Sequence, residues 1–384
     1  MDLFNKSAKE TQKELVLEVP PKNEGFAKEK LVGNKVEVGF EHFGQMQPLI
    51  SKRDITDIEY NGRNLWVTDI YGIHKKVEDI ELSENFVYQF TQRIANAVSK
   101  DFNKTAPVLE AEAIVDTKEE RISIRIEVIH EDKAVTGRAF CIRKTPSYAR
   151  ITEEGAIAEG YMTSKELVFL KNCIKAHMNI MICGEPGVGK TELAKFLSLY
   201  IPGDEKVITI EDNLEWHYKD LKPDSDCIEL QVGENFNYVD AIKTCMRMSP
   251  KWMMTSEVRG SESEDYMQAL STGVTGIATI HTESALKIPG RLLNMARDRS
   301  ALERMEQDIN SFLNIGINVR KVMTKEGNIK RMISEIVAFS EDGNASMVFL
   351  NGVQREAEVP ESIREKFARF SVSNAFRDEQ EWEG

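Results

Sequence analysis

Several features that would identify other classes of protein are missing from this sequence of 384 residues. The five cysteines form no Cys-x-x-Cys pair, so the sequence predicts neither a disulfide framework nor a zinc ribbon. No stretch approaches the roughly 18 uninterrupted apolar residues of a membrane-spanning helix, and the N-terminal segment lacks the apolar centre of a signal peptide. We therefore expect a cytoplasmic protein whose contact with any membrane is peripheral.

Positive charge is also scarce, because 50 Lys and Arg residues stand against 63 Asp and Glu residues, giving a formal net charge of −13. Proteins that bind nucleic acid usually present a basic surface, and no run here interleaves basic and aromatic residues. We expect no direct nucleic-acid binding. The hydrophobic content of 41% is sufficient for the buried cores of two domains.

The pattern along the chain predicts two domains joined by a linker. In the first, Asn61-Gly62 lies between two short apolar runs, as in a hairpin. Residues 121–128 alternate apolar and polar side chains, which is typical of a half-buried strand. The predicted divisions are a charged N-terminal tail (1–47), an α+β N-terminal domain (48–143), a linker (144–160) and a larger domain with a C-terminal extension (161–384).

The larger domain alternates short apolar runs with amphipathic segments, which predicts a largely parallel sheet covered by helices. The expected strands are 180–183, 207–210, 252–255 and 277–280. Glu211, Glu257 and His281 each follow the end of one of these runs. Because open α/β sheets bind their ligands at the carboxyl ends of the strands, we expect these three side chains at one site.

The clearest motif fits the pattern G-x-x-x-x-G-K-[ST] in full and lies between a predicted strand and a predicted helix. In such a loop the backbone N–H groups and the helix N-terminus surround phosphate oxygens. Lys190 is expected to reach the β- and γ-phosphates, and Thr191 to coordinate Mg²⁺. The sequence therefore predicts ATP and Mg²⁺ as cofactors, bound by Gly184, Glu185, Pro186, Gly187, Val188, Gly189, Lys190 and Thr191.

Hydrolysis also needs a group that orients water and accepts its proton, usually a carboxylate. Glu257 and Glu211 are the two candidates, and Glu257 also has the placement of an acid beside the metal. His281 could hydrogen-bond the γ-phosphate and register its loss. The predicted catalytic set is thus Glu257, Glu211, Lys190 and His281, with one of the two acids as the base.

Four motifs in this order resemble those of the type II/type IV secretion ATPase family, in particular its pilus-assembly and type IV secretion branch. They are a Walker A box (184–191), an Asp box (209–212), a Walker B box (256–260) and a His box (272–281). The resemblance implies a RecA-like P-loop NTPase domain after a smaller α+β domain. It also implies a homohexamer that acts with an inner-membrane platform protein in pilus assembly, protein secretion or conjugation, and a nucleotide site completed by Arg138 and Arg143.

The chain departs from the family at three positions, where Val274, Ser256 and Thr282 stand in place of the usual His, Gly and Ala. These changes leave the four predicted catalytic residues intact, so we expect hydrolysis to be retained. Two alternatives to the motor remain, a nucleotide-binding scaffold with weak hydrolysis and a nucleic-acid translocase, since RecA-like sheets serve several functions.

Overall fold

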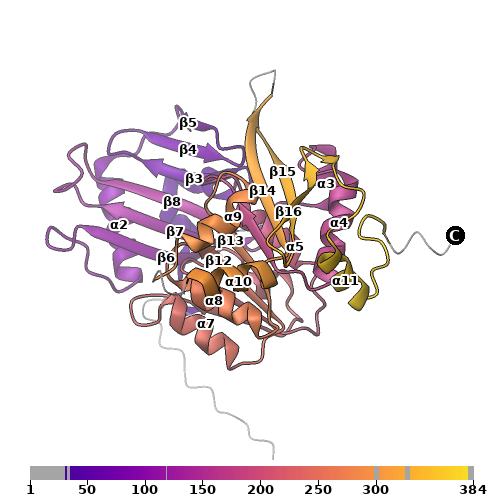
Figure 1. Ribbon diagram of the computed structural model, residues 1–384. Coiled ribbons are helices and arrows are strands. Elements are labelled where there is room, and N and C mark those ends of the chain that lie inside the picture. Colours follow the sequence, from indigo (N-terminus) through magenta and orange to yellow (C-terminus); the bar gives the residue numbers. More distant parts are fainter. Residues whose placement is uncertain (1–30, 33–34, 118, 298–301, 325–328, 379–384) are drawn as a thin grey trace, which may run out of the picture.

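A computed structural model describes residues 31–32, 35–117, 119–297, 302–324 and 329–378. Figure 1 shows two domains side by side, each built around its own sheet: an eight-stranded sheet in the N-terminal domain and a nine-stranded sheet in the larger domain. Separate hydrophobic cores stabilise them. No helix in the described ranges is both long enough and apolar enough to span a membrane.

The N-terminal domain is an α+β unit in which one long helix packs against a mainly antiparallel sheet. The sheet has the order β1-β2-β6-β7-β8-β3-β4-β5, and only the β2–β6 pair is parallel among its neighbours. The predicted hairpin at Asn61-Gly62 is confirmed as β3 and β4. The elements are β1 (Leu31–Val32), β2 (Lys35–Gly39), η1 (Phe40–Met46), α1 (Gln47–Ser51), β3 (Ile55–Tyr60), β4 (Leu65–Asp69), β5 (His74–Lys76), α2 (Glu84–Ala97), β6 (Val108–Asp116), β7 (Arg121–Ile129) and β8 (Ala139–Pro146).

The structure corrects the predicted N-terminal tail, because residues 35–47 belong to the folded domain. Val36 and Val38 of β2 are buried, and Phe43 and Met46 of η1 are fully buried in the same core. The sequence did not reveal them because a five-residue strand followed by a seven-residue 3₁₀ helix is too short for a hydrophobic period to stand out. Residues 1–30 lie outside the described part of the chain.

The predicted linker also begins too early, since strand β8 continues to Pro146. Lys144 is 6% exposed, and its ammonium donates to the carbonyl oxygen of Ile50 at 2.8 Å. A buried lysine whose charge is bound by backbone carbonyls looks polar in the sequence but is part of the core. The connection to the second domain then includes helix α3 (Glu153–Ala158).

The larger domain has a sheet in the order β11-β10-β12-β13-β9-β14-β15-β16-β17, whose first six strands are parallel and whose last pairs are antiparallel. All four strands expected in this domain are present, and the predicted RecA-like architecture is confirmed. The strands are β9 (Ile180–Cys183), β10 (Val207–Glu211), β11 (Cys227–Gln231), β12 (Trp252–Val258), β13 (Thr275–Ile280), β14 (Ile315–Met323), β15 (Ile329–Phe339), β16 (Ala345–Leu350) and β17 (Val353–Gln354).

Helices cover both faces of this sheet, as separate core clusters on its two sides indicate. Helix α4 begins at a complete capping box, in which Thr163 and Glu166 satisfy each other's backbone N–H groups. The remaining helices are α4 (Ser164–Lys175), α5 (Lys190–Ser198), α6 (Tyr218–Leu221), α7 (Tyr238–Met246), α8 (Glu262–Ser271), η2 (Ala285–Lys287), α9 (Ile288–Leu293), α10 (Leu302–Phe312) and α11 (Glu361–Arg369).

The membership of residues 35–47 in the folded core can be tested at Phe43, whose ring lies 5.5 Å from that of Phe90. We expect Phe43→Ala to lower the free energy of unfolding by about 3–5 kcal/mol, because it removes a fully buried aromatic side chain. Denaturant unfolding of the full chain measures this value. Glu41→Ala, an exposed change in the same segment, is the control; equal effects of the two variants would contradict the assignment.

Candidate functional site

The Gly184–Thr191 loop connects β9 to α5 in a backbone conformation that only glycine adopts easily. Gly184 has φ = +146°, and a Cβ atom there would lie 2.4 Å from the carbonyl oxygen of Val319. Gly187 and Gly189 also have positive φ, +70° and +96°, and Gly189 is the N-cap of α5. The loop therefore turns tightly over the carboxyl end of β9, and the N-terminus of α5 points toward the centre of the loop.

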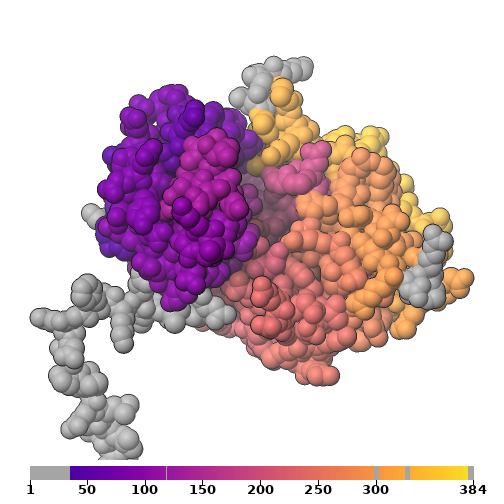
Figure 2. All heavy atoms as spheres, turned by 90° about the vertical axis from the view of Figure 1, so that its left-hand side faces the viewer, coloured from indigo at the N-terminus to yellow at the C-terminus, as the bar shows by residue number. Residues whose placement is uncertain are grey.

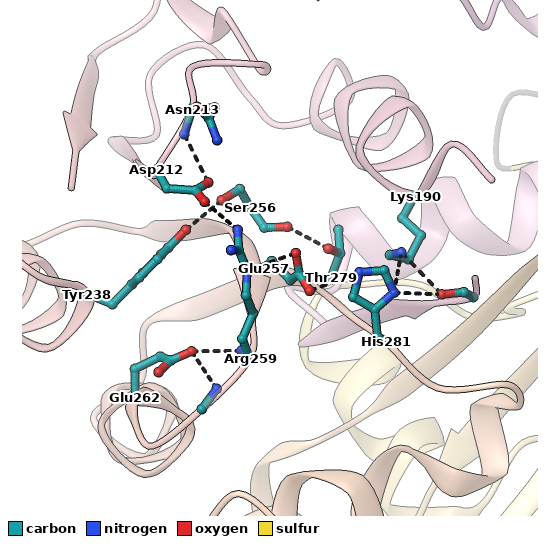
Figure 3. A network of polar contacts seen from close by, with 12 residues as sticks. Lys190, Asp212, Asn213, Tyr238, Ser256, Glu257, Arg259, Glu262, Thr279 and His281 are labelled. Carbon is teal, nitrogen blue, oxygen red and sulfur yellow. Dashed lines mark hydrogen bonds and ion pairs between the residues drawn. The ribbon is translucent and has the colours of Figure 1, made fainter. Parts of the chain in front are cut away.

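Lys190 is folded back into this loop. Its ammonium donates to the carbonyl oxygens of Gly184 and Glu185, at 3.2 Å each, and to Nδ1 of His281 at 3.2 Å (Figure 3). Burial lowers the pKa of Lys190, and the nearby charge of Glu257 acts in the opposite direction. The lysine is a partly desolvated cation held by neutral acceptors, so phosphate oxygens would be stronger partners for it.

Glu257 and His281 continue the same network across the strand ends (Figure 3). Nε2 of His281 lies 3.0 Å from one carboxylate oxygen of Glu257, and Nε of Arg259 lies 3.0 Å from the other. Nδ1 of His281 also lies 3.3 Å from the carbonyl oxygen of Gly184. An imidazole with its proton on Nε2 accepts from the lysine and donates to Glu257. The structure thus brings together three of the four predicted catalytic side chains, Lys190, Glu257 and His281.

Glu211 is placed differently from these three. Its side chain is fully buried, and one carboxylate oxygen accepts the backbone N–H groups of Glu215 at 2.8 Å and Trp216 at 3.1 Å. The other oxygen has no hydrogen-bond partner among the described residues. Burial raises the pKa of Glu211 to about 8. Glu211 therefore organises the loop after β10 and makes no contact with the Walker A loop.

Glu215 has no role predicted from the sequence. It lies where the loop after β10 approaches helix α5, which follows the Walker A loop. Burial raises its pKa, whereas the positive charge of Arg143 and the hydroxyl of Thr191 lower it. Together with Arg125 and Arg143 it lines a small pocket between the two domains. Its position four residues after Glu211 was the only sequence signal. Arg125 was missed as well, although it is the cross-strand neighbour of Arg143 in the β7–β8 pair.

The two arginines implied by the family resemblance lie in different surroundings. Arg143 is half exposed on β8, donates to Asp57 at 2.8 Å, and faces the pocket with Glu215. Arg138 is buried inside the N-terminal domain, where it bonds to Glu131 at 2.6 Å and Thr91 at 2.9 Å. Its guanidinium also lies over the ring of Tyr88, 4.8 Å from the centroid. Only Arg143 is placed to act at the site between the domains.

A groove separates the two domains in Figure 2, between the indigo N-terminal domain and the orange part of the larger domain, with magenta atoms at its floor. Contacts cross this boundary at both sheets: Arg331 donates to the carbonyl oxygen of Ile70, and Gln231 donates to Glu112 at 3.1 Å. Arg331 also donates to the carbonyl oxygen of Gly187 in its own domain, at 3.3 Å. The residues fit a nucleoside triphosphate with Mg²⁺, because a loop with three glycines at positive φ and the N-terminus of α5 lie beside Lys190 and Thr191. The carboxylates of Glu257 and Glu215 lie next to these two side chains.

Comparisons with known proteins show which family and fold the chain resembles. A model of the family described as Type II/IV secretion system protein matches residues 93–358. An uncharacterized protein of Bacillus anthracis is 31% identical over 319 residues, covering 80% of this chain and 70% of that protein. A putative conjugal transfer protein of Mycobacterium tuberculosis is 24% identical, covering 67% and 75%. The ATPase DotB of Yersinia pseudotuberculosis has a similar fold, with a TM-score of 0.62, 18% identity and coverage of 83% and 84%.

The burial of Glu211 leads to a prediction about pH. The folded-state pKa of about 8 lies above the ordinary value of 4.5. The stability that the protonated carboxyl provides is therefore fully present below the ordinary pKa and is lost as pH rises through about 8. We expect Glu211→Gln, which keeps an acceptor for the two N–H groups, to remove this fall. Thermal unfolding of both proteins from pH 5 to pH 8 measures it; parallel curves would contradict the assignment.

Proposed function

The chain belongs to the type II/IV secretion system protein family, and from this premise we propose that it is an ATPase that works as a homohexameric motor. The observation that carries the proposal is the network of Lys190, His281 and Glu257 across the Walker A loop. It joins a phosphate-binding lysine to a carboxylate through one imidazole, so loss of a γ-phosphate would be transmitted to the end of β12.

We propose the following division of roles at the site. Thr191 holds Mg²⁺, Glu257 lies beside the metal, and Lys190 binds the β- and γ-phosphates. Glu215 accepts the proton of the attacking water, because it lies next to Thr191 and burial raises its pKa above the ordinary value. Glu211 has a positioning role, since its bonds to the backbone at Glu215 and Trp216 fix the loop that carries the proposed base.

Arg143, with Arg125 beside it, is proposed to couple the nucleotide to movement of the N-terminal domain. Both guanidiniums lie on the face of the N-terminal sheet that meets the Glu215 loop. Charge on the nucleotide would draw this face toward the larger domain and narrow the groove. This is the movement that a motor needs if each cycle of ATP binding and release is to shift one domain against the other.

The work is proposed to take place at the cytoplasmic face of the inner membrane, on a platform protein of a pilus, secretion or conjugation machine. Relatives that include the putative conjugal transfer protein and a type IV secretion system protein of Bordetella pertussis support this setting. The formal net charge of −13 supports a protein partner over direct contact with nucleic acid.

The assigned roles can be tested by steady-state ATPase turnover across a size-exclusion profile. We expect Lys190→Ala, Glu257→Gln and Glu215→Gln each to lower kcat by at least about 100-fold, because each removes a group that acts in the transition state. Wild-type turnover is expected in a high-mass peak. Glu234→Gln, an exposed loop acid, is the matched control.

Three outcomes separate the alternatives. Wild-type protein that binds ATP yet turns over no faster than the variants would replace the motor with a nucleotide-dependent scaffold. Turnover stimulated by single- or double-stranded DNA would favour a translocase. Full activity of Glu215→Gln with loss in Glu257→Gln would move the proton acceptor to Glu257.

Arg143 and Arg138 provide a second test. We expect Arg143→Gln to lower kcat/KM for ATP by roughly tenfold or more with little change in Tm, since its guanidinium is half exposed beside the site. Arg138→Gln is expected to lower the free energy of unfolding by about 3 kcal/mol, because it breaks a buried charge network. Calorimetry and ATPase assays on both variants measure this; the reverse pattern would contradict the placement.

A further inference from the structure

A second cavity lies at the opposite edge of the larger sheet from the Walker A loop. Its volume is about 340 Å³, within the range of small-molecule sites. It is lined by residues that precede the parallel strands, such as Asn179 before β9 and Val274 before β13, and by side chains of α11. Because the strands are parallel, a site at their amino ends is separate from the nucleotide site at their carboxyl ends.

Positive charge exceeds negative charge on the wall of this cavity. Lys251, Lys366 and Arg369 line it together with a single carboxylate, that of Glu341. Within the described ranges no carboxylate oxygen lies within 4 Å of the Lys366 ammonium, which donates a hydrogen bond to the amide oxygen of Asn314 at 2.7 Å. Burial lowers the pKa of Lys366 to about 8. A cation is thus partly removed from water beside another cation, without an acid to compensate it.

Two further polar atoms of the lining residues have no partner. Nδ1 of His177 and Oγ of Ser362 are buried, and neither makes a hydrogen bond in the described part of the chain. Water or a ligand in the cavity would give these buried atoms a hydrogen-bond partner. The aromatic rings of Phe312, Phe339 and Phe370 form part of the same wall and would exclude bulk water from a ligand held there.

We propose that this cavity is a second ligand site, which binds a small soluble anion carrying phosphate groups. Lys366, Arg369 and Lys251 would compensate the charge of the anion, and Ser362 and His177 would hydrogen-bond its oxygens. Phosphate groups suit the site because they accept several hydrogen bonds at once and tolerate partly desolvated cations as partners.

Hydrogen bonds connect the cavity to the strands that carry the catalytic groups. Asn314 accepts from Lys366 and from the backbone N–H of Asn179, at 2.7 and 2.9 Å. The side-chain oxygen of Asn179 accepts the N–H of Gly276 in β13 at 2.8 Å. Strand β9 leads from Asn179 to the Walker A loop, and β13 leads to His281. An anion on Lys366 would therefore act on the starting points of the two strands that end at the nucleotide site.

The cations could instead serve the helices, since α8 and α10 end at this cavity and α11 has Lys366 and Arg369 in its last turn. Carboxyl ends of helices carry partial negative charge, and nearby cations stabilise them. The two explanations make opposite predictions for an uncharged replacement. A cation that only neutralises helix ends stabilises the free protein, whereas an uncompensated cation kept for a ligand destabilises it.

The test uses the full chain saturated with Mg-ADP, so that the Walker A site is occupied, and titrates it with inorganic pyrophosphate in a calorimeter. We expect binding to the wild type at micromolar to millimolar pyrophosphate, weakened at least tenfold in Lys366→Met. Arg364→Met, which replaces an exposed cation on the same helix outside the cavity, is the matched control and should bind as the wild type does. Without pyrophosphate, Lys366→Met should have an equal or higher Tm than the wild type.

Absence of pyrophosphate binding to the wild type, or equal weakening in both variants, would overturn the proposal. A Tm of Lys366→Met well below that of Arg364→Met, with binding unchanged, would assign the lysine to the helix ends alone. The readouts are heat of binding and Tm, so they are independent of whether the protein hydrolyses ATP.

Discussion

Strand β9 is fixed at both of its ends, and both the nucleotide site and the second cavity depend on this. All four of its residues are buried, so it has no freedom to adjust sideways. At its start, Asn179 is bonded to Phe312, Asn314 and Gly276. At its end, Gly184 turns so close to the Val319 carbonyl that no side chain would fit. Displacement at one end of such a strand is passed to the other, because the packed residues between cannot absorb it.

Three acidic side chains near the end of this strand differ in how deeply they are buried. Glu211 is fully enclosed and holds a loop, Glu215 is partly enclosed beside Thr191, and Glu257 faces His281 and Arg259. Burial raises the pKa of the first two acids, and the same physical effect has different consequences at each. In Glu211 burial favours the uncharged carboxyl that holds the loop, whereas in Glu215 it raises the pKa of the carboxylate that is proposed as the base.

The sequence predicted the elements with a strong local signal and failed where burial depends on distant partners. The Walker A loop and the four strands of the parallel sheet follow from motif or period alone. Residues 35–47 and Lys144 were misassigned, because their burial depends on contacts with a sheet that sequence order does not reveal. The same limit explains why the sequence could not distinguish Arg138 from Arg143. Both lie at or near β8, and only the fold shows which of them faces the pocket between the domains.

The change of the usual His to Val274 is best understood from its position. Val274 precedes β13, whereas His281 follows it, so at about 3.3 Å per residue the two lie roughly 20 Å apart along the strand. The substitution therefore leaves the contacts of His281 with Lys190 and Glu257 unaltered. It changes the wall of the second cavity instead, where an apolar side chain replaces one that could have carried charge. The departure from the family pattern thus concerns the amino edge of the sheet, and the groups proposed to act at the carboxyl edge, Lys190, Glu257 and His281, remain in contact with one another.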